Sequence, residues 1–86
     1  MNILKETQYL QFVLLNRDKD RKTDVVLINN KHHNMTIGYI KWFGRWRQYC
    51  FFPYGETTWN TDCLESINEV IKQLMNTRNK KKLEKL

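Results

Sequence analysis

The stretch from Ile37 to Phe52, IGYIKWFGRWRQYCFF, decides the fold of this chain. β-Branched and aromatic residues dominate both sides of a glycine, which is typical of two strands joined by a tight turn. Gly44 supplies the backbone freedom that such a turn needs. We therefore expect a hairpin with strands at Met35–Trp42 and Arg45–Phe52, and Pro53 ends the second strand because it cannot donate to a ladder.

The length of the turn sets the register of this hairpin. If Phe43, Gly44 and Arg45 form a three-residue turn, one register follows from it. The pairs are then Trp42 with Trp46, Lys41 with Arg47, Tyr39 with Tyr49 and Ile37 with Phe51. If the turn is one residue shorter, the register shifts by one and the side chains are redistributed between the two faces.

The two faces of the hairpin differ in this register. The face expected to pack under a helix carries Gly38, Ile40, Trp42, Trp46, Cys50 and Phe52. The other face carries Tyr39, Lys41, Arg47, Tyr49 and Phe51. Rings between cations suit a nucleic acid or nucleotide, because bases stack on rings while cations meet phosphates. An ordinary solvated sheet face is the alternative interpretation. The candidate ligand-binding residues are Tyr39, Lys41, Arg45, Arg47 and Tyr49.

Two further strands are expected before the hairpin, at Gln8–Asn16 and at Asp24–Asn29, the second a β-branched run. The charged segment Arg17–Thr23 between them is typical of a solvated loop. A helix is expected to begin near Asn60 to Asp62, with Asp62 and Glu65 as a capping pair. Its apolar stripe consists of Leu64, Ile67, Val70, Ile71, Leu74 and Met75.

The predicted fold class is therefore α+β. A four-stranded antiparallel sheet in the order β-β-β-β-α would carry one C-terminal amphipathic helix on one face. The chain has 86 residues, of which 41% are hydrophobic and 13% aromatic, so a single folded domain is expected over residues 1–76. Such a sheet leaves its second face partly bare, with Phe12, Val26, Ile28 or their neighbours exposed, and a homodimer through the sheet would cover them.

Most of the net charge of +6 lies in the last ten residues. Residues 77–86 hold five cations against one carboxylate, a local charge of +4, which leaves +2 for residues 1–76. We expect a flexible basic tail that contacts phosphates through Arg78, Lys80, Lys81 and Lys82. The alternative is a solvated tail whose cations only complement the helix dipole.

No catalytic constellation is found in the sequence, and we expect no enzyme, no cofactor and no metal. His32 and His33 adjoin in a turn without further ligands nearby, and Cys50 and Cys63 are typical of small core residues. Two cysteines without a spaced framework favour a reducing, cytoplasmic setting. No apolar run approaches the length that a membrane span needs.

The run GYIKWFGRWRQYCFFP from Gly38 to Pro53, followed by Trp59 and DCLxxI, resembles a group of small uncharacterised proteins of bacteriophages and mobile elements of low-GC bacteria. The shared pattern is an IKW strand, a WRQYxFxP hairpin and a helix that opens with CLxxI. It covers roughly the C-terminal half of the chain. The resemblance implies a non-enzymatic role in the cytoplasm of a bacterial host, and it transfers no settled activity.

Three functions fit these patterns. The first is a module that binds a nucleic acid or nucleotide through the hairpin, with help from the tail. The second is an anti-defence inhibitor or adaptor that binds a host protein through the same hairpin, because Trp, Tyr and Arg also dominate protein interfaces. The third is a protein that sequesters a small phosphorylated signal in a pocket closed by dimerisation.

Overall fold

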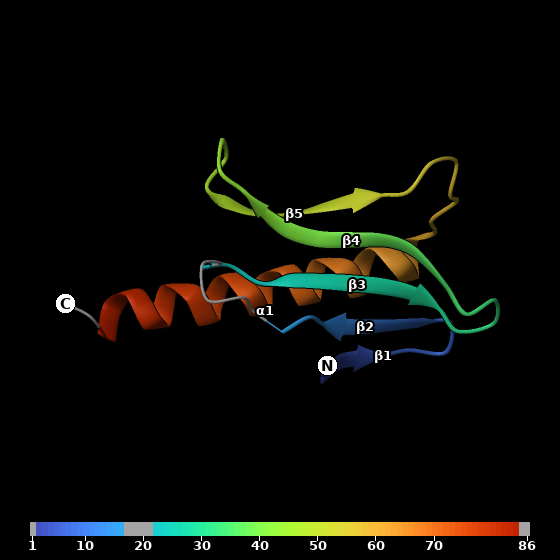
Figure 1. Ribbon diagram of the computed structural model, residues 1–86, viewed down its shortest axis with the longest axis horizontal. Helices are drawn as coiled ribbons and strands as arrows, with labels where there is room; N and C mark the ends of the chain where they lie inside the picture. The colour runs from blue at the N-terminus through green and yellow to red at the C-terminus, as the bar shows by residue number, and fades with distance from the viewer. Residues whose placement is uncertain (1, 17–21, 85–86) are drawn as a thin grey trace.

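The chain folds into one five-stranded antiparallel sheet with a helix across one face (Figure 1). The computed structural model describes residues 2–16 and 22–84, with side chains described as far as residue 80. Each strand pairs with the next one in the sequence. The elements are β1 (Asn2–Glu6), β2 (Leu10–Leu14), β3 (Val25–Asn30), β4 (Met35–Phe43), β5 (Gln48–Pro53) and α1 (Thr61–Glu84). The α+β class with one C-terminal helix is confirmed.

The prediction of four strands is wrong, because β1 adds a fifth at the edge. β1 pairs with β2 through a bulge between Ile3 and Lys5. The side chain of Lys5 forms an ion pair with Glu69 of α1, so β1 is tied to the helix as well as to β2. The sequence NILKE has only two adjacent apolar residues and no alternation. It forms a strand because it pairs with β2, and no local sequence pattern predicts this pairing.

The core lies between α1 and the face of the sheet that the helix covers. Phe12, Val26, Ile28 and Ile40 are fully buried there. The prediction that Phe12, Val26 or Ile28 face the bare side is wrong. It is their neighbours Val13 and Leu27 that alternate onto the opposite face of the sheet. Burial of each large apolar side chain stabilises the fold by about 1.5–3 kcal/mol, so these four residues anchor the sheet to the helix.

The apolar stripe of α1 is largely confirmed. Ile67, Val70 and Leu74 are buried, and Ile71 and Met75 pack against the core. Leu64 departs from the stripe: it is 48% exposed, whereas its neighbour Cys63 packs against the core.

The N-terminal cap of α1 is Asn60 rather than Asp62. The Oδ1 atom of Asn60 accepts a hydrogen bond of 2.9 Å from the backbone N–H of Cys63. Asp62 lies inside the first turn, where its charge complements the helix dipole. The capping position therefore comes two residues earlier than the Asp–Glu spacing indicated.

Helix α1 is longer than the strands of the sheet. Its 24 residues span about 36 Å at 1.5 Å per residue, and its C-terminal part extends past the strands (Figure 1). The basic segment predicted as a separate tail is thus helical in its backbone as far as Glu84; its flexibility stays a prediction. Most of the predicted loop Arg17–Thr23, residues 17–21, lies outside the described residues.

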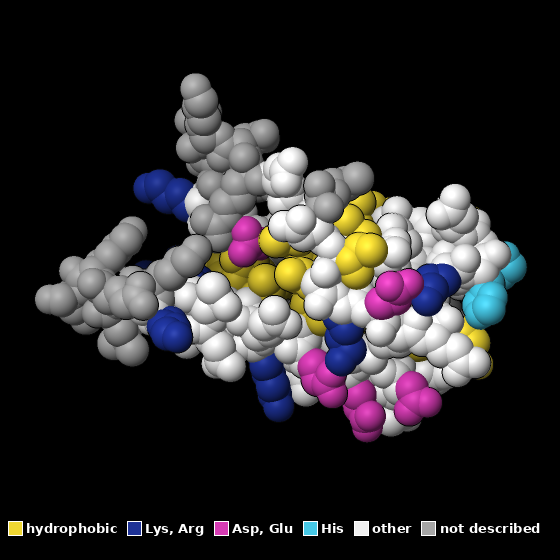
Figure 2. All heavy atoms as spheres, turned by 90° about the horizontal axis from the view of Figure 1, so that it is seen from below, with side chains coloured by type: hydrophobic (Ala, Val, Ile, Leu, Met, Phe, Trp, Pro, Cys, Tyr) yellow, Lys and Arg dark blue, Asp and Glu magenta, His cyan; other side chains and the backbone are white. Residues whose placement is uncertain are grey.

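β1 and β5 are the edge strands of the sheet. Figure 2, which views the molecule from the β1 side, shows hydrophobic side chains in the middle of that side and charged side chains below them. Ile3 of β1 is 54% exposed. Within the described part of the chain, no helix is long and apolar enough to cross a membrane.

Candidate functional site

The hairpin between β4 and β5 closes through a four-residue turn, Gly44–Arg47. The N–H of Trp46 donates to the carbonyl of Phe43 at 3.2 Å, and the N–H of Arg47 donates to that of Gly44 at 3.3 Å. Arg47 then takes a left-handed backbone conformation, with φ 52°. The predicted three-residue turn is wrong, since the left-handed residue that redirects the chain is Arg47 and not the glycine.

This turn changes the register of the hairpin. Tyr39 pairs with Phe52 rather than with Tyr49, and Lys41 pairs with Cys50 rather than with Arg47. The shift is an odd number of residues, so every side chain of β5 changes face relative to the prediction. The alternation along β4 is as expected, with Tyr39 and Lys41 on the face away from α1.

The outer face of the sheet, the face opposite α1, carries a stacked aromatic pair. The rings of Tyr39 and Phe52 lie 5.2 Å apart between centroids with 14° between their planes. The Nζ atom of Lys41 lies 5.8 Å from the centroid of Tyr39 and 5.6 Å from that of Phe52. Both distances are within the range of a cation–π interaction. One cation is thus held beside two parallel rings.

Three more rings extend this pair along the hairpin. Phe43 packs edge-on against Trp46 at 5.0 Å and lies 6.2 Å from Phe52. Tyr54 packs edge-on against Tyr39 at 5.6 Å. Trp46 is 66% exposed and Tyr54 43% exposed. We call the set Tyr39, Phe43, Trp46, Phe52 and Tyr54 the outer aromatic strip. Its rings hold one another in place, so they present a preformed surface for flat ligands.

The cations of the hairpin have no carboxylate partner among the described residues. Lys41 is exposed on the outer face, and Arg45 and Arg47 are exposed in the turn. None of the three forms an ion pair with another residue in the described part of the chain. Their charges are therefore available to an anion from solution.

Tyr49, the fifth predicted ligand-binding residue, belongs to the core. It is 3% exposed, and its ring packs edge-on against Trp42 at 5.3 Å. Its hydroxyl accepts a hydrogen bond of 3.0 Å from the backbone N–H of Asp24, and its own N–H lies 3.5 Å from the sulfur of Met75. Tyr49 is thus enclosed between the sheet and α1, and a ligand on the outer face does not reach it.

Phe52, Phe43, Trp46 and Tyr54 are the members of the strip that sequence reasoning did not include. Phe52 and Trp46 were assigned to the face under the helix, as a result of the wrong turn length. Aromatic residues stand at both alternating positions of β5, at Tyr49 and Phe51 and also at Phe52. No local signal therefore distinguishes the two registers.

The predicted tail residues differ in their surroundings. The guanidinium of Arg78 lies 4.1 Å from the ring centroid of Trp42, on the helix side of the hairpin. Lys80 is exposed. The side chains of Lys81 and Lys82 lie outside the described residues.

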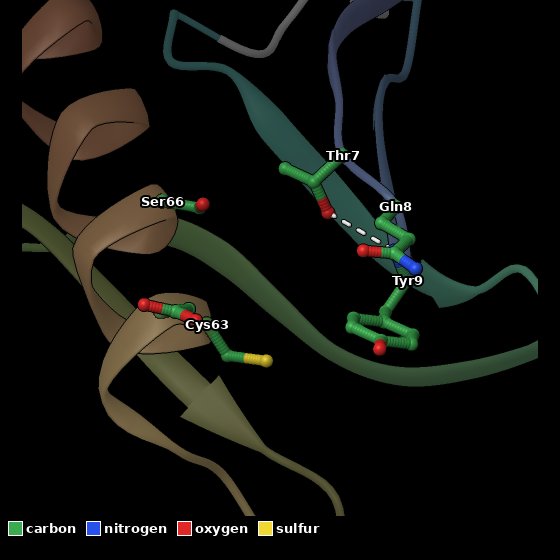
Figure 3. Close-up of a pocket in the computed structure, with 6 residues that line it drawn as sticks. Thr7, Gln8, Tyr9, Cys63 and Ser66 are labelled. Atoms are coloured by element: carbon green, nitrogen blue, oxygen red, sulfur yellow. Dashed lines mark hydrogen bonds between the residues drawn. The ribbon is translucent and has the colours of Figure 1, made fainter.

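The remaining polar features have local structural roles. The backbone N–H groups of His32 and His33 donate to the side chain of Asn30, which fixes the turn between β3 and β4. No three His, Cys, Asp or Glu residues converge within the described ranges 2–16 and 22–80. A shallow depression lies between the β1–β2 turn and the start of α1, as Figure 3 shows. Its Thr7 hydroxyl accepts a hydrogen bond from the N–H of Leu10 and so closes the turn.

The chain has a relative among phage proteins. It is 39% identical over 75 residues to a protein described as an uncharacterized 9.3 kDa protein of Acholeplasma phage L2. The match covers 87% of this chain and 95% of the relative. The chain belongs to the family of this phage protein. No family model matches the sequence, and no solved structure matches it.

The family assignment confirms the predicted resemblance to small phage proteins. The match extends over most of the chain and over nearly all of the relative, so it reaches well beyond the C-terminal half in which the motifs lie. The two proteins are also of similar mass, 10.6 kDa against 9.3 kDa.

Proposed function

We propose that this member of the phage family is a non-enzymatic protein that binds a nucleic acid or nucleotide through the outer aromatic strip. It would act in the cytoplasm of a bacterial host, on behalf of a phage or related mobile element. The observation that carries the proposal is the parallel pair of Tyr39 and Phe52 with Lys41 beside both rings.

Each part of this arrangement matches a part of the ligand. A base stacks on an aromatic ring with about 1–3 kcal/mol, whatever its sequence. Lys41 on the face, and Arg45 and Arg47 in the turn, lie beside the strip where phosphates of a stacked ligand would run. The absence of ion pairs at these three cations within the described part of the chain supports this role.

The backbone of Arg47 supports the proposal independently. A left-handed conformation costs an L-amino acid other than glycine roughly 1–2 kcal/mol, and Gly or Asn would adopt it more easily. An arginine stands there nevertheless, with φ 52°. Backbone strain of this kind clusters at functional sites, which favours a binding role for the Arg47 side chain.

The direct test is fluorescence anisotropy with labelled DNA and RNA at about 50 and about 200 mM salt. We expect binding that weakens as salt rises, that is lost in Lys41→Ala/Arg47→Ala, and that falls in Tyr39→Ala. Lys72→Ala is the matched control, since Lys72 is an exposed cation of α1 away from the hairpin. A wild-type protein that binds no nucleic acid or nucleotide at low salt refutes the proposal.

Arg47→Gly sharpens this test. Glycine relieves the left-handed strain, so the variant is expected to be as stable as the wild type or more stable, by about 1 kcal/mol. It also removes a cation, so its affinity for nucleic acid should fall. Weaker binding in a protein that unfolds no more easily cannot be attributed to a damaged fold.

A host protein is the second candidate ligand, in the role of an anti-defence inhibitor or adaptor. Trp46 favours it, because a tryptophan 66% exposed at a hairpin tip beside arginines is typical of interface hot spots. Trp46→Ala separates the two candidates. A protein partner that inserts Trp46 would lose most of its affinity, whereas nucleic acid stacked on Tyr39 and Phe52 would lose only a part.

A further inference from the structure

Arg78 connects the C-terminal part of α1 to the tip of the hairpin. Its guanidinium lies over the ring of Trp42, and its side chain is half-buried by this contact. Trp42 is one residue pair away from the turn Gly44–Arg47. Figure 1 shows the turn and the C-terminal half of α1 at the same end of the molecule. The helix therefore places a cation on Trp42, close to the turn that carries Arg45 and Arg47.

The two ion pairs between described residues lie away from the hairpin. Lys5 of β1 pairs with Glu69, and Lys31 pairs with Glu6 at 2.9 Å. Seen from the β1 side, most acidic side chains gather away from the C-terminal end of α1 (Figure 2). By contrast, seven described cations form no ion pair with any described residue: Lys22, Lys41, Arg45, Arg47, Lys72, Arg78 and Lys80. Five of these seven lie on the hairpin or on the C-terminal part of α1, so most of the unpaired positive charge of the described residues is on these two elements.

We infer that the binding site continues from the outer aromatic strip, round the hairpin tip, to Arg78, and that it takes a single nucleic-acid strand of several nucleotides. This inference rests on the proposed function and specifies its ligand. From Tyr39 to Gly44 a strand covers about 17 Å, at about 3.3 Å per residue. A stacked nucleic-acid strand advances about 3.4 Å per nucleotide, so about five nucleotides reach from the stacked rings to the turn. A mononucleotide is too short to contact both the stacked rings and the turn.

A duplex does not fit this path. Its bases are stacked and paired inside the helix, so they cannot lie on the rings of Tyr39 and Phe52. A single strand exposes its bases to the outer face and is flexible enough to turn round the hairpin tip toward Arg78. The split of rings and cations between the two sides of the hairpin therefore favours a single strand.

Strand length provides the test, with the full-length protein and labelled single strands of about 3 and about 12 nucleotides. Arg78→Gln should weaken binding of the longer strand by about 2- to 5-fold at low salt, as expected for one exposed charge contact. It should also reduce the slope of log K against log salt concentration by about 0.7. The shorter strand should bind Arg78→Gln and the wild type equally.

Lys72→Gln is the matched control, because it removes the same charge from an exposed position of α1. Arg78→Lys keeps the charge and should restore most of the salt slope. Thermal unfolding of each variant establishes that binding is measured on folded protein.

The outcomes separate the inference from the proposed function. If Arg78→Gln affects the longer strand no more than Lys72→Gln, while Tyr39→Ala still weakens binding, the extended path is wrong and the strip remains the site. If a duplex competes as well as a single strand, the inferred ligand is wrong. If no strand binds the wild type, the proposed function itself is wrong.

Discussion

Tyr49 allows the register of the hairpin to be tested by stability and binding together. Tyr49→Phe removes only the hydroxyl that accepts the hydrogen bond from the N–H of Asp24 at 3.0 Å. A hydrogen bond of this kind contributes about 1 kcal/mol, so the free energy of unfolding should fall by that amount. Tyr49→Ala also removes a ring that is 3% exposed, which should lower the free energy of unfolding by about 3–5 kcal/mol. That is a large share of the roughly 5–15 kcal/mol that stabilise a typical domain.

The same substitutions at Tyr39 should change the free energy of unfolding less, and removal of the Tyr39 ring should weaken binding. No residue in the described ranges hydrogen-bonds to the hydroxyl of Tyr39, so Tyr39→Phe should change the free energy of unfolding by less than about 0.5 kcal/mol. Tyr39→Ala removes the stacking on Phe52, worth about 1 kcal/mol of stability. It should also cost about 1–3 kcal/mol of binding free energy for a nucleic acid.

Urea unfolding followed by tryptophan fluorescence measures the stability of the four variants, and anisotropy with a labelled single strand measures their binding. Tyr49→Phe should lower the unfolding midpoint and leave the affinity unchanged. A Tyr49→Phe protein with an unchanged midpoint and weaker binding would refute this reasoning. It would place Tyr49 beside the ligand, as the three-residue turn requires.

Three further predictions concern the scaffold of the site. Gly38→Ala should lower the free energy of unfolding by about 1–2 kcal/mol, because a Cβ there would lie 2.9 Å from a ring carbon of β5, and overpacking outweighs the roughly 0.5–1 kcal/mol gained by replacing a strand glycine. Gly44→Ala is the control, since a Cβ there meets no atom within 4 Å, and equal losses in urea unfolding would contradict the argument. Asn60→Ala should cost about 1 kcal/mol through the lost helix cap, and Asn60→Asp should retain most of it; thermal unfolding of both shows whether the cap matters. Glu69→Gln breaks the partly exposed pair with Lys5 and should cost less than about 1 kcal/mol, with the difference from wild type vanishing at high salt; a loss unaffected by salt would argue against an electrostatic contribution.

The helix was predictable because its pattern is local. The spacing of Ile67, Val70, Ile71, Leu74 and Met75 describes one side of a helix, whatever it packs against. The strands of the hairpin and the role of Pro53 at the end of β5 were predictable for a similar reason.

β1 was not predictable, because its stability depends on partners far away in the sequence. Neither of its two adjacent apolar residues is fully buried; β1 is held by its pairing with β2 and by the packing of Leu4 against the core. A further contribution is the contact of Lys5 with Glu69 of α1, which is 64 residues away in the sequence. Long-range contacts of this kind leave no mark in a window of a few residues.

The sequence by itself determined that this is an α+β protein with one amphipathic helix, an aromatic hairpin and a surplus of positive charge. It also determined that Tyr39 and Lys41 share a face, since alternation along one strand needs no partner. Only the tertiary structure decided which residues of β5 join them. Tyr49, Phe51 and Phe52 include aromatic residues of both alternating sets, so either register offers α1 an aromatic surface. The four-residue turn, and the enclosure of Tyr49 by Trp42 and Met75, select one register and put Phe52 on the outer face. Because side chains alternate between the two faces of a strand, the length of the turn decided which residues of β5 belong to the candidate site.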